Sequence, residues 1–134
     1  MDARAPMASR VYKDYKIYSC FVLNRLVSEV DIDLYQEGLE EKLDPILERG
    51  QPGLSKEEVK HEIRSNHHMT NKVLENLQED GLVAVDKQDG RYRVRITKEG
   101  VLYLRKYNAF YKEIYEEQIR DHYRFRGELP FWLR

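Results

Sequence analysis

The segment SNHHMTNKVLENLQEDGLV, residues 65–83, limits the fold of this chain more than any other stretch. Its apolar residues recur every three or four positions, the spacing that places side chains on one face of a helix. Gly81 follows them, and glycine most easily adopts the left-handed conformation that ends a helix. We therefore predict a helix that begins near Asn66, ends at Gly81 and is held to a core by Met69, Val73, Leu74 and Leu77.

Two short runs with alternating apolar residues come next, LVAVDK at 82–87 and RYRVRI at 91–96. Alternation of this kind is typical of a strand with one buried face. The Asp89-Gly90 pair between the runs is a strong signal for a tight turn between antiparallel strands. The sequence thus predicts a β-hairpin whose inward residues are Val83, Val85, Tyr92, Val94 and Ile96.

Capping signals predict helices on both sides of this unit. Ser55 and Glu58 have the spacing of a capping box, which predicts a short helix over residues 56–64. Thr97 is expected to cap a final helix that continues towards Tyr123.

The N-terminal part of the chain predicts two further helices. Apolar positions from Val11 to about Glu29 follow helical spacing. Asp31 or Asp33 is expected to cap the second helix. Pro45 is expected to disturb that helix, because proline lacks an N–H group and clashes with the preceding turn.

These signals predict a mainly α protein with a small β-hairpin. We divide the chain into a flexible N-terminus at 1–10, N-terminal helices at 11–53, a central unit at 54–100, and a C-terminal helix with an aromatic tail at 101–134. No apolar run approaches the roughly 20 residues needed to cross a membrane. A single cysteine, Cys20, suits a reducing compartment, so we expect a cytoplasmic protein with no membrane association.

From Leu54 to Leu104, the order of short helix, turn, second helix and hairpin resembles the DNA-binding core of prokaryotic winged-helix transcriptional regulators. The run LQEDGLV at 77–83 is similar to the end of that family's recognition helix, and the segment 92–100 resembles its second wing strand followed by Thr-x-x-Gly. With one helix before and a long helix after, the layout is similar to MarR-type or PadR-type regulators. The resemblance implies a winged helix-turn-helix core flanked by N- and C-terminal helices, in a transcriptional regulator that binds double-stranded DNA.

The predicted recognition helix would offer its outer face to DNA. Its polar N-terminal residues lie where such helices meet base edges; they are Asn66, His67, His68, Thr70, Asn71 and Lys72. Asn71 can pair with adenine, Thr70 can meet a thymine methyl group or a phosphate, and Lys72 can meet a phosphate. On the hairpin, the basic residues that can bind phosphates are Lys87, Arg91, Arg93 and Arg95.

These residues also have other interpretations. The helix face can simply be solvated, and the arginines can protect a hairpin edge from aggregation. The net charge is -1 and the segment 31–58 is mostly acidic, both of which are unusual for a protein bound to DNA. The alternative function is a winged-helix protein-interaction module in a larger complex, binding through the aromatic ends or the tail ELPFWLR.

Aromatic residues cluster near both ends of the chain and exceed what one helix stripe can bury in a monomer. We predict a homodimer formed by the first and last helices, because tyrosines are common at interfaces and most assemblies are symmetric. The predicted contacts are Tyr12, Tyr15, Tyr18, Tyr107, Tyr111 and Tyr115. The alternatives are that these helices pack only on each other within one chain, or that the tyrosines line a pocket for a small effector.

The sequence favours neither catalysis nor a cofactor. It has no glycine-rich phosphate loop, nucleophile elbow or serine-histidine pattern, so we expect no enzyme. His67 and His68 are adjacent and point about 100° apart on a helix, which makes them poor joint ligands, and no metal site is predicted. Cys20 is expected to be buried. The alternative, a thiol redox sensor, would need a neighbour that stabilises the thiolate.

Overall fold

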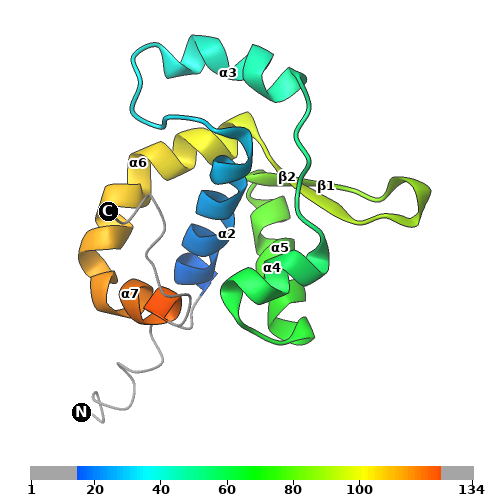
Figure 1. Ribbon diagram of the computed structural model, residues 1–134, viewed down its shortest axis with the longest axis vertical. Helices are drawn as coiled ribbons and strands as arrows, with labels where there is room; N and C mark the ends of the chain where they lie inside the picture. Colours follow the sequence, from blue (N-terminus) through cyan, green and yellow to red (C-terminus); the bar gives the residue numbers. More distant parts are fainter. Residues whose placement is uncertain (1–14, 125–134) are drawn as a thin grey trace.

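The computed structural model describes residues 15–124, and this part of the chain is mainly helical with one two-stranded antiparallel hairpin (Figure 1). In chain order the elements are α2 (Tyr15–Val30), α3 (Leu39–Glu48), α4 (Lys56–Ile63), α5 (His67–Glu79), β1 (Val83–Asp86), the 3-10 turn η1 (Gln88–Gly90), β2 (Arg93–Ile96), α6 (Lys98–Ile114) and α7 (Glu116–Arg124). The predicted class, mainly α with a small hairpin, is confirmed. No helix of these residues is long and apolar enough to cross a membrane.

The central helix of the core is α2. It is apolar on nearly every side, and Ile17, Leu23 and Leu26 are fully buried. Figure 1 places it between α6 on one side and α4 and α5 on the other, and it contacts all three as well as β2. A helix that is hydrophobic all round is one that protein surrounds. The core therefore includes α2 as well as the elements between residues 54 and 100.

The predicted caps of α4 and α6 are confirmed, and Asn66 caps α5 as well. The Ser55 hydroxyl accepts a hydrogen bond from the Glu58 N–H at 3.0 Å, and the Glu58 carboxylate accepts one from the Ser55 N–H at 2.8 Å. Asn66 and Thr97 accept hydrogen bonds from backbone N–H groups in the first turns of α5 and α6. Each cap satisfies donors that a first turn leaves without an intrahelical partner. Local sequence thus fixes where these three helices begin.

The hairpin pairs as the alternation predicts. Val85 lies opposite Val94, and the side chains of Val94 and Ile96 are buried against the helices. Asp89 and Gly90 both have positive φ, 56° and 72°, as a tight hairpin turn requires. The predicted turn is confirmed.

Two backbone contacts attach the hairpin to its surroundings. Leu54, just before α4, bridges Val94 through two backbone hydrogen bonds of 2.9 and 2.7 Å, so a third extended segment lies beside β2. At the start of α6, Gly100 lies so close to the chain after α5 that a Cβ atom there would overlap the Leu82 carbonyl oxygen. The hairpin is therefore held between the loop before α4 and the first turn of α6.

The prediction that Asp31 or Asp33 caps the second helix is wrong, because α3 begins at Leu39. The Asp33 carboxylate instead accepts a hydrogen bond from the Tyr35 N–H at 3.1 Å, as in an Asx turn. Helix α3 also continues through Pro45, contrary to the expected disturbance. Its outer side is exposed, so water can bond to the carbonyl that the proline leaves without a donor.

The single C-terminal helix that was expected to reach Tyr123 is two helices. The chain turns between α6 and α7 at Tyr115, which has φ -115° and ψ 23°, and α7 then packs on α6. Several predictions fall on residues outside the described part of the chain. They are the flexible N-terminus at 1–10, the start of the first helix at Val11 and the aromatic tail beyond Arg124.

Candidate nucleic-acid interface

The outer face of α5 is exposed from its first turn. His67, His68, Asn71 and Lys72 are all exposed, as is Glu75 one turn later. The helix is fixed from behind by contacts with α2, α4 and β1 and by three buried side chains, Val73, Leu74 and Leu77. The four polar residues at its N-terminal end therefore point away from the core, as predicted.

Two residues predicted for this face are placed differently. Thr70 is fully buried, and its hydroxyl donates a hydrogen bond to the Asn66 carbonyl at 2.8 Å. It precedes Val73 by three residues and Leu74 by four, so helical periodicity puts it on the inner face. The prediction that Thr70 contacts DNA is wrong. Asn66 is exposed, but its side-chain oxygen serves as the N-cap of α5.

The three arginines of the hairpin differ in how available they are. Arg91 is exposed, whereas Arg93 pairs with Glu58 of α4 at 3.4 Å. Arg95 donates hydrogen bonds to Asp86 at 3.0 Å and to a backbone carbonyl in the loop before α4 at 2.9 Å. Arg95 is thus engaged within the fold, and Arg91 is the arginine most available to a partner.

Acids accompany these arginines. The Asp86 carboxylate accepts a hydrogen bond from the Gln88 N–H at 3.0 Å as well as the bond from Arg95. These two bonds, the backbone one first, hold the pKa of Asp86 below its ordinary value. The three arginines line one open pocket with Pro52, Asp86, Gln88 and Asp89. Charges of both signs therefore meet beside the hairpin.

Tyr92 links the hairpin to α4. The ammonium nitrogen of Lys56 lies 4.5 Å from the centre of its ring and that of Lys87 lies 5.9 Å away, within the range of cation–π attraction. Burial and the charge of Glu75 raise the pKa of Tyr92. Lys56 was not predicted as a site residue; its only sequence signal is its place as the first residue of a capped helix. The α5–hairpin surface, as we name it, consists of Lys56, His67, His68, Asn71, Lys72, Lys87 and Arg91.

Acidic side chains also border the α5–hairpin surface. Glu57 pairs with Lys60 at 3.2 Å and with His61 at 3.5 Å. The hydrogen bond from Lys60, and then the charges of Lys60, His61 and His67, lower the pKa of Glu57. Glu75 is exposed among the polar residues of α5 itself. These acids weaken the attraction that the lysines alone would exert on phosphates.

Three of the six tyrosines predicted to form a dimer interface lie inside the chain. Tyr18, Tyr111 and Tyr115 are buried, so the prediction that they contact a second copy is wrong. Helices α2 and α6 pack on each other within one chain, which is the alternative interpretation of the aromatic clusters. Tyr107 is half-buried on α6, while Tyr12 and the side chain of Tyr15 lie outside the described part. A dimer would therefore have to use side chains other than Tyr18, Tyr111 and Tyr115.

Cys20 is fully buried between α2 and α6. The Asn24 amide donates a hydrogen bond to its sulfur at 3.5 Å, and the thiol donates one to the Asn108 side-chain oxygen at 3.7 Å. Burial raises the pKa of the thiol to about 12, although the Asn24 bond acts in the opposite direction. A thiol that is neither exposed nor ionised does not suit a redox sensor, so the packing interpretation holds.

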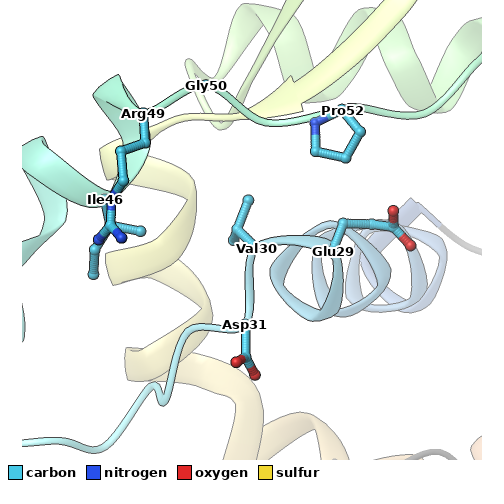
Figure 2. Close-up of a pocket in the computed structure, with 7 residues that line it drawn as sticks. All are labelled: Glu29, Val30, Asp31, Ile46, Arg49, Gly50 and Pro52. Atoms are coloured by element: carbon cyan, nitrogen blue, oxygen red, sulfur yellow. The ribbon is translucent and has the colours of Figure 1, made fainter.

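Figure 2 shows an open pocket between the C-terminal ends of α2 and α3. Glu29 and Asp31 contribute carboxylates and Arg49 a guanidinium, and the remaining lining residues are Val30, Ile46, Gly50 and Pro52. None of these lining residues is a tyrosine. The pocket is therefore not the effector site that the aromatic clusters suggested.

Within residues 15–124, no group of three or more His, Cys, Asp or Glu side chains is placed to hold a metal ion. No protein-family model, curated protein or solved structure matches the chain. A function must therefore be inferred from the geometry of the chain itself.

Proposed function

We propose that the protein is a transcriptional regulator that binds double-stranded DNA through a winged helix-turn-helix unit, with α5 as the recognition helix and the β1–β2 hairpin as the wing. The observation that carries this proposal is the exposed N-terminal half of α5 beside the hairpin. The order α4, α5, hairpin and α6, together with the Leu54–Val94 bridge, supports it. The proposed setting is the cytoplasm, and the proposed activity is binding rather than catalysis.

The exposed side chains of α5 have the chemistry to read DNA. The major groove is about 12 Å wide and accepts one α-helix. The Asn71 amide can donate to and accept from adenine at once, and Lys72 can pair with a phosphate. His67 and His68 lie in the first turn, where the positive end of the helix dipole attracts phosphate oxygens.

The hairpin adds exposed cations beside that helix. Lys87 and Arg91 are both exposed, and Lys56 lies against the same hairpin through Tyr92. Cations at such positions can bind the phosphate backbone next to the groove, which contributes affinity without sequence choice.

The proposal is tested by measuring binding to genomic DNA fragments as the salt concentration changes. Arg91→Ala should weaken binding to all fragments and reduce the slope of log affinity against log salt by about one. Asn71→Ala should mainly relax sequence choice and cost about 1–3 kcal/mol on preferred sites. Lys42→Ala, which removes an exposed lysine on α3, is the matched control and should change neither. If no duplex binds in a salt-sensitive way, the proposal is wrong.

A second candidate is a winged-helix protein-interaction module in a larger complex. The pairing of Glu58 with Arg93 and of Asp86 with Arg95 favours it, because these acids reduce the positive charge of the hairpin. The tail ELPFWLR, which this candidate uses for partner binding, lies outside the described residues. The module predicts co-purification with a protein partner and no DNA binding. A pull-down in which Trp132→Ala retains every partner would show that the tail does not bind the partner.

A further inference from the structure

Helix α6 carries a second apolar stripe besides the one that packs in the core. The inner stripe is buried and contains Val101, Leu104, Asn108 and Tyr111. The second stripe, which we name the α6 seam, consists of Tyr103, Tyr107, Phe110 and Ile114. Phe110 is 57% and Ile114 is 51% exposed, while the two tyrosines are half-buried. Large apolar side chains gathered on one exposed face mark an interaction surface.

The spacing of the α6 seam is that of a coiled coil. Its residues follow one another at intervals of four, three and four positions. Tyr107 and Ile114 therefore take a positions of a heptad, and Tyr103 and Phe110 take d positions. A seam with this spacing fits another helix with the same spacing.

The two flanks of the α6 seam differ. On the core side, the e positions hold Leu104 and Tyr111, both buried. On the solvent side, the g positions hold Lys106 and Glu113, which are exposed and opposite in charge. In the described part of the chain neither of them forms an ion pair, and Lys106 Nζ lies over the Tyr107 ring, 5.3 Å from its centre. Both charges are thus available to a partner that lies on the seam.

We propose that the α6 seam binds the α6 seam of a second copy of this chain in antiparallel orientation. In an antiparallel pair of helices, each a residue packs against a d residue of the other helix. Tyr107 then lies opposite Phe110 of the other copy, and Tyr103 lies opposite Ile114. The register forms four apolar layers related by a twofold axis, as a symmetric homodimer requires.

Charge complementarity selects this occupant and this orientation. In the antiparallel register the g positions of the two helices face each other, which brings Lys106 of each copy beside Glu113 of the other. The two ion pairs are identical by symmetry and lie at the solvent edge of the seam. A parallel pair would instead place each g charge beside a buried e residue, either Leu104 or Tyr111.

The position of α6 leaves the proposed DNA contact free. Figure 1 shows α6 beginning at the base of the hairpin and running to the side of α2 that faces away from α5, and α2 contacts both α6 and α5. A second copy bound to the α6 seam therefore does not cover the α5–hairpin surface of either copy. The dimer is inferred from α6 alone and does not depend on DNA binding.

Sedimentation velocity of the full chain without DNA, over a range of protein concentrations, measures the dimer dissociation constant. Lys106→Glu and Glu113→Lys should each raise it about tenfold or more, because like charges then meet across the seam. The double variant restores opposite charges and should return to within about threefold of the unmodified chain. Lys42→Glu makes the same charge change on an exposed residue of α3 and should leave the constant unchanged.

Phe110→Ser tests the apolar layers of the seam and should raise the dissociation constant by about a hundredfold. Phe110 is exposed, so the variant should keep its fold, which circular dichroism checks. A chain that is monomeric at every soluble concentration overturns the proposal, whatever else covers the seam. A dimer that the single charge changes do not weaken, or a double variant that does not recover, overturns it too. Because DNA is absent, a dimer that later binds no DNA counts only against the proposed function.

Discussion

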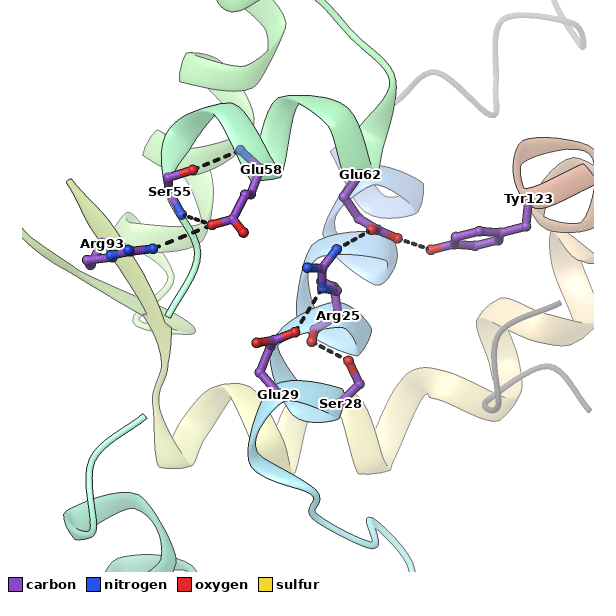
Figure 3. A network of polar contacts seen from close by, with 8 residues as sticks. All are labelled: Arg25, Ser28, Glu29, Ser55, Glu58, Glu62, Arg93 and Tyr123. Atoms are coloured by element: carbon purple, nitrogen blue, oxygen red, sulfur yellow. Dashed lines mark hydrogen bonds and ion pairs between the residues drawn. The ribbon is translucent and has the colours of Figure 1, made fainter. Parts of the chain in front are cut away.

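Two glutamates one turn apart on α4 each bind an arginine, but in opposite surroundings (Figure 3). Glu62 is 3% exposed and accepts hydrogen bonds from Arg25 at 3.0 Å and from the Tyr123 hydroxyl at 2.7 Å. The Glu58 side chain is 48% exposed and accepts from Arg93 at 3.4 Å. A buried charge is costly without its partners, whereas an ion pair in water contributes little. The two glutamates therefore differ in their expected contribution to stability because of their burial and not because of the kind of bond they form.

The difference assigns the two glutamates different roles. Glu62 joins three helices, because Arg25 belongs to α2 and Tyr123 to α7. The Glu58–Arg93 pair joins α4 to the hairpin at the edge of the α5–hairpin surface. The first set of contacts holds the core together, and the second restrains an arginine that the sequence predicts to bind phosphates.

Glu62→Ala tests the buried glutamate and has the largest expected effect on the free energy of unfolding. It leaves Arg25 and the Tyr123 hydroxyl without their acceptor, and removal of one partner from a buried pair costs about 3–5 kcal/mol. Arg25 is partly exposed, so we expect the free energy of unfolding to fall by about 3 kcal/mol. Urea denaturation followed by circular dichroism measures it. Glu62→Gln, which keeps an acceptor for Tyr123, should lose less, and a loss below about 1 kcal/mol for Glu62→Ala would contradict this assignment.

Features set by neighbours in the chain could be predicted from the sequence. The caps at Ser55, Asn66 and Thr97 bond to backbone groups within three residues, so their spacing alone identifies them. The Asp89-Gly90 turn is equally local, because it depends on which residues tolerate positive φ. These signals place α4, α5, the hairpin and the start of α6, and with them most of the polar face of α5.

Features set by distant partners could not be predicted. Glu62 meets groups 37 and 61 residues away, so its contacts do not follow from the local sequence, although it follows Val59 at the helical spacing of a buried face. Thr70 is different, because its spacing from Val73 and Leu74 indicates the inner face and its hydroxyl bonds within its own turn, so its burial could be predicted. The aromatic clusters gave no indication of which tyrosines α2 and α6 bury against each other.

Glu58→Gln tests the exposed glutamate through the pH dependence of the stability of the fold. The hydrogen bond from the Ser55 N–H lowers the pKa of Glu58 below its ordinary value of 4.5. A carboxylate with a lowered folded pKa stabilises the fold fully above its unfolded pKa, and this contribution is lost as the pH falls through the folded value. Stability of the unmodified chain should therefore fall on acidification below 4.5, and that of Glu58→Gln should fall less.

Urea denaturation from neutral pH to about pH 3 measures this difference. Because Glu58 is half exposed, we expect the difference to stay below about 1 kcal/mol. Glu48→Gln, which removes an exposed carboxylate at the end of α3, is the matched control. Identical pH profiles for Glu58→Gln and the unmodified chain would show that the Glu58 cap does not contribute to the loss of stability at low pH.

Arg93→Ala should have the smallest effect on stability, a change of less than about 0.5 kcal/mol in the free energy of unfolding, because its pair with Glu58 is exposed. Its effect on DNA binding separates two roles of Arg93, a phosphate contact and an edge residue of the hairpin. If Arg93 serves phosphates, Glu58 competes with them for it, so Glu58→Gln should tighten DNA binding at low salt, where such competition is least screened. Fluorescence anisotropy with a labelled duplex measures this gain. Adding Arg93→Ala to Glu58→Gln should lower the gain in DNA affinity. A gain that persists without Arg93 would show that Glu58 repels DNA directly. Arg93 would then be only an edge residue of the hairpin.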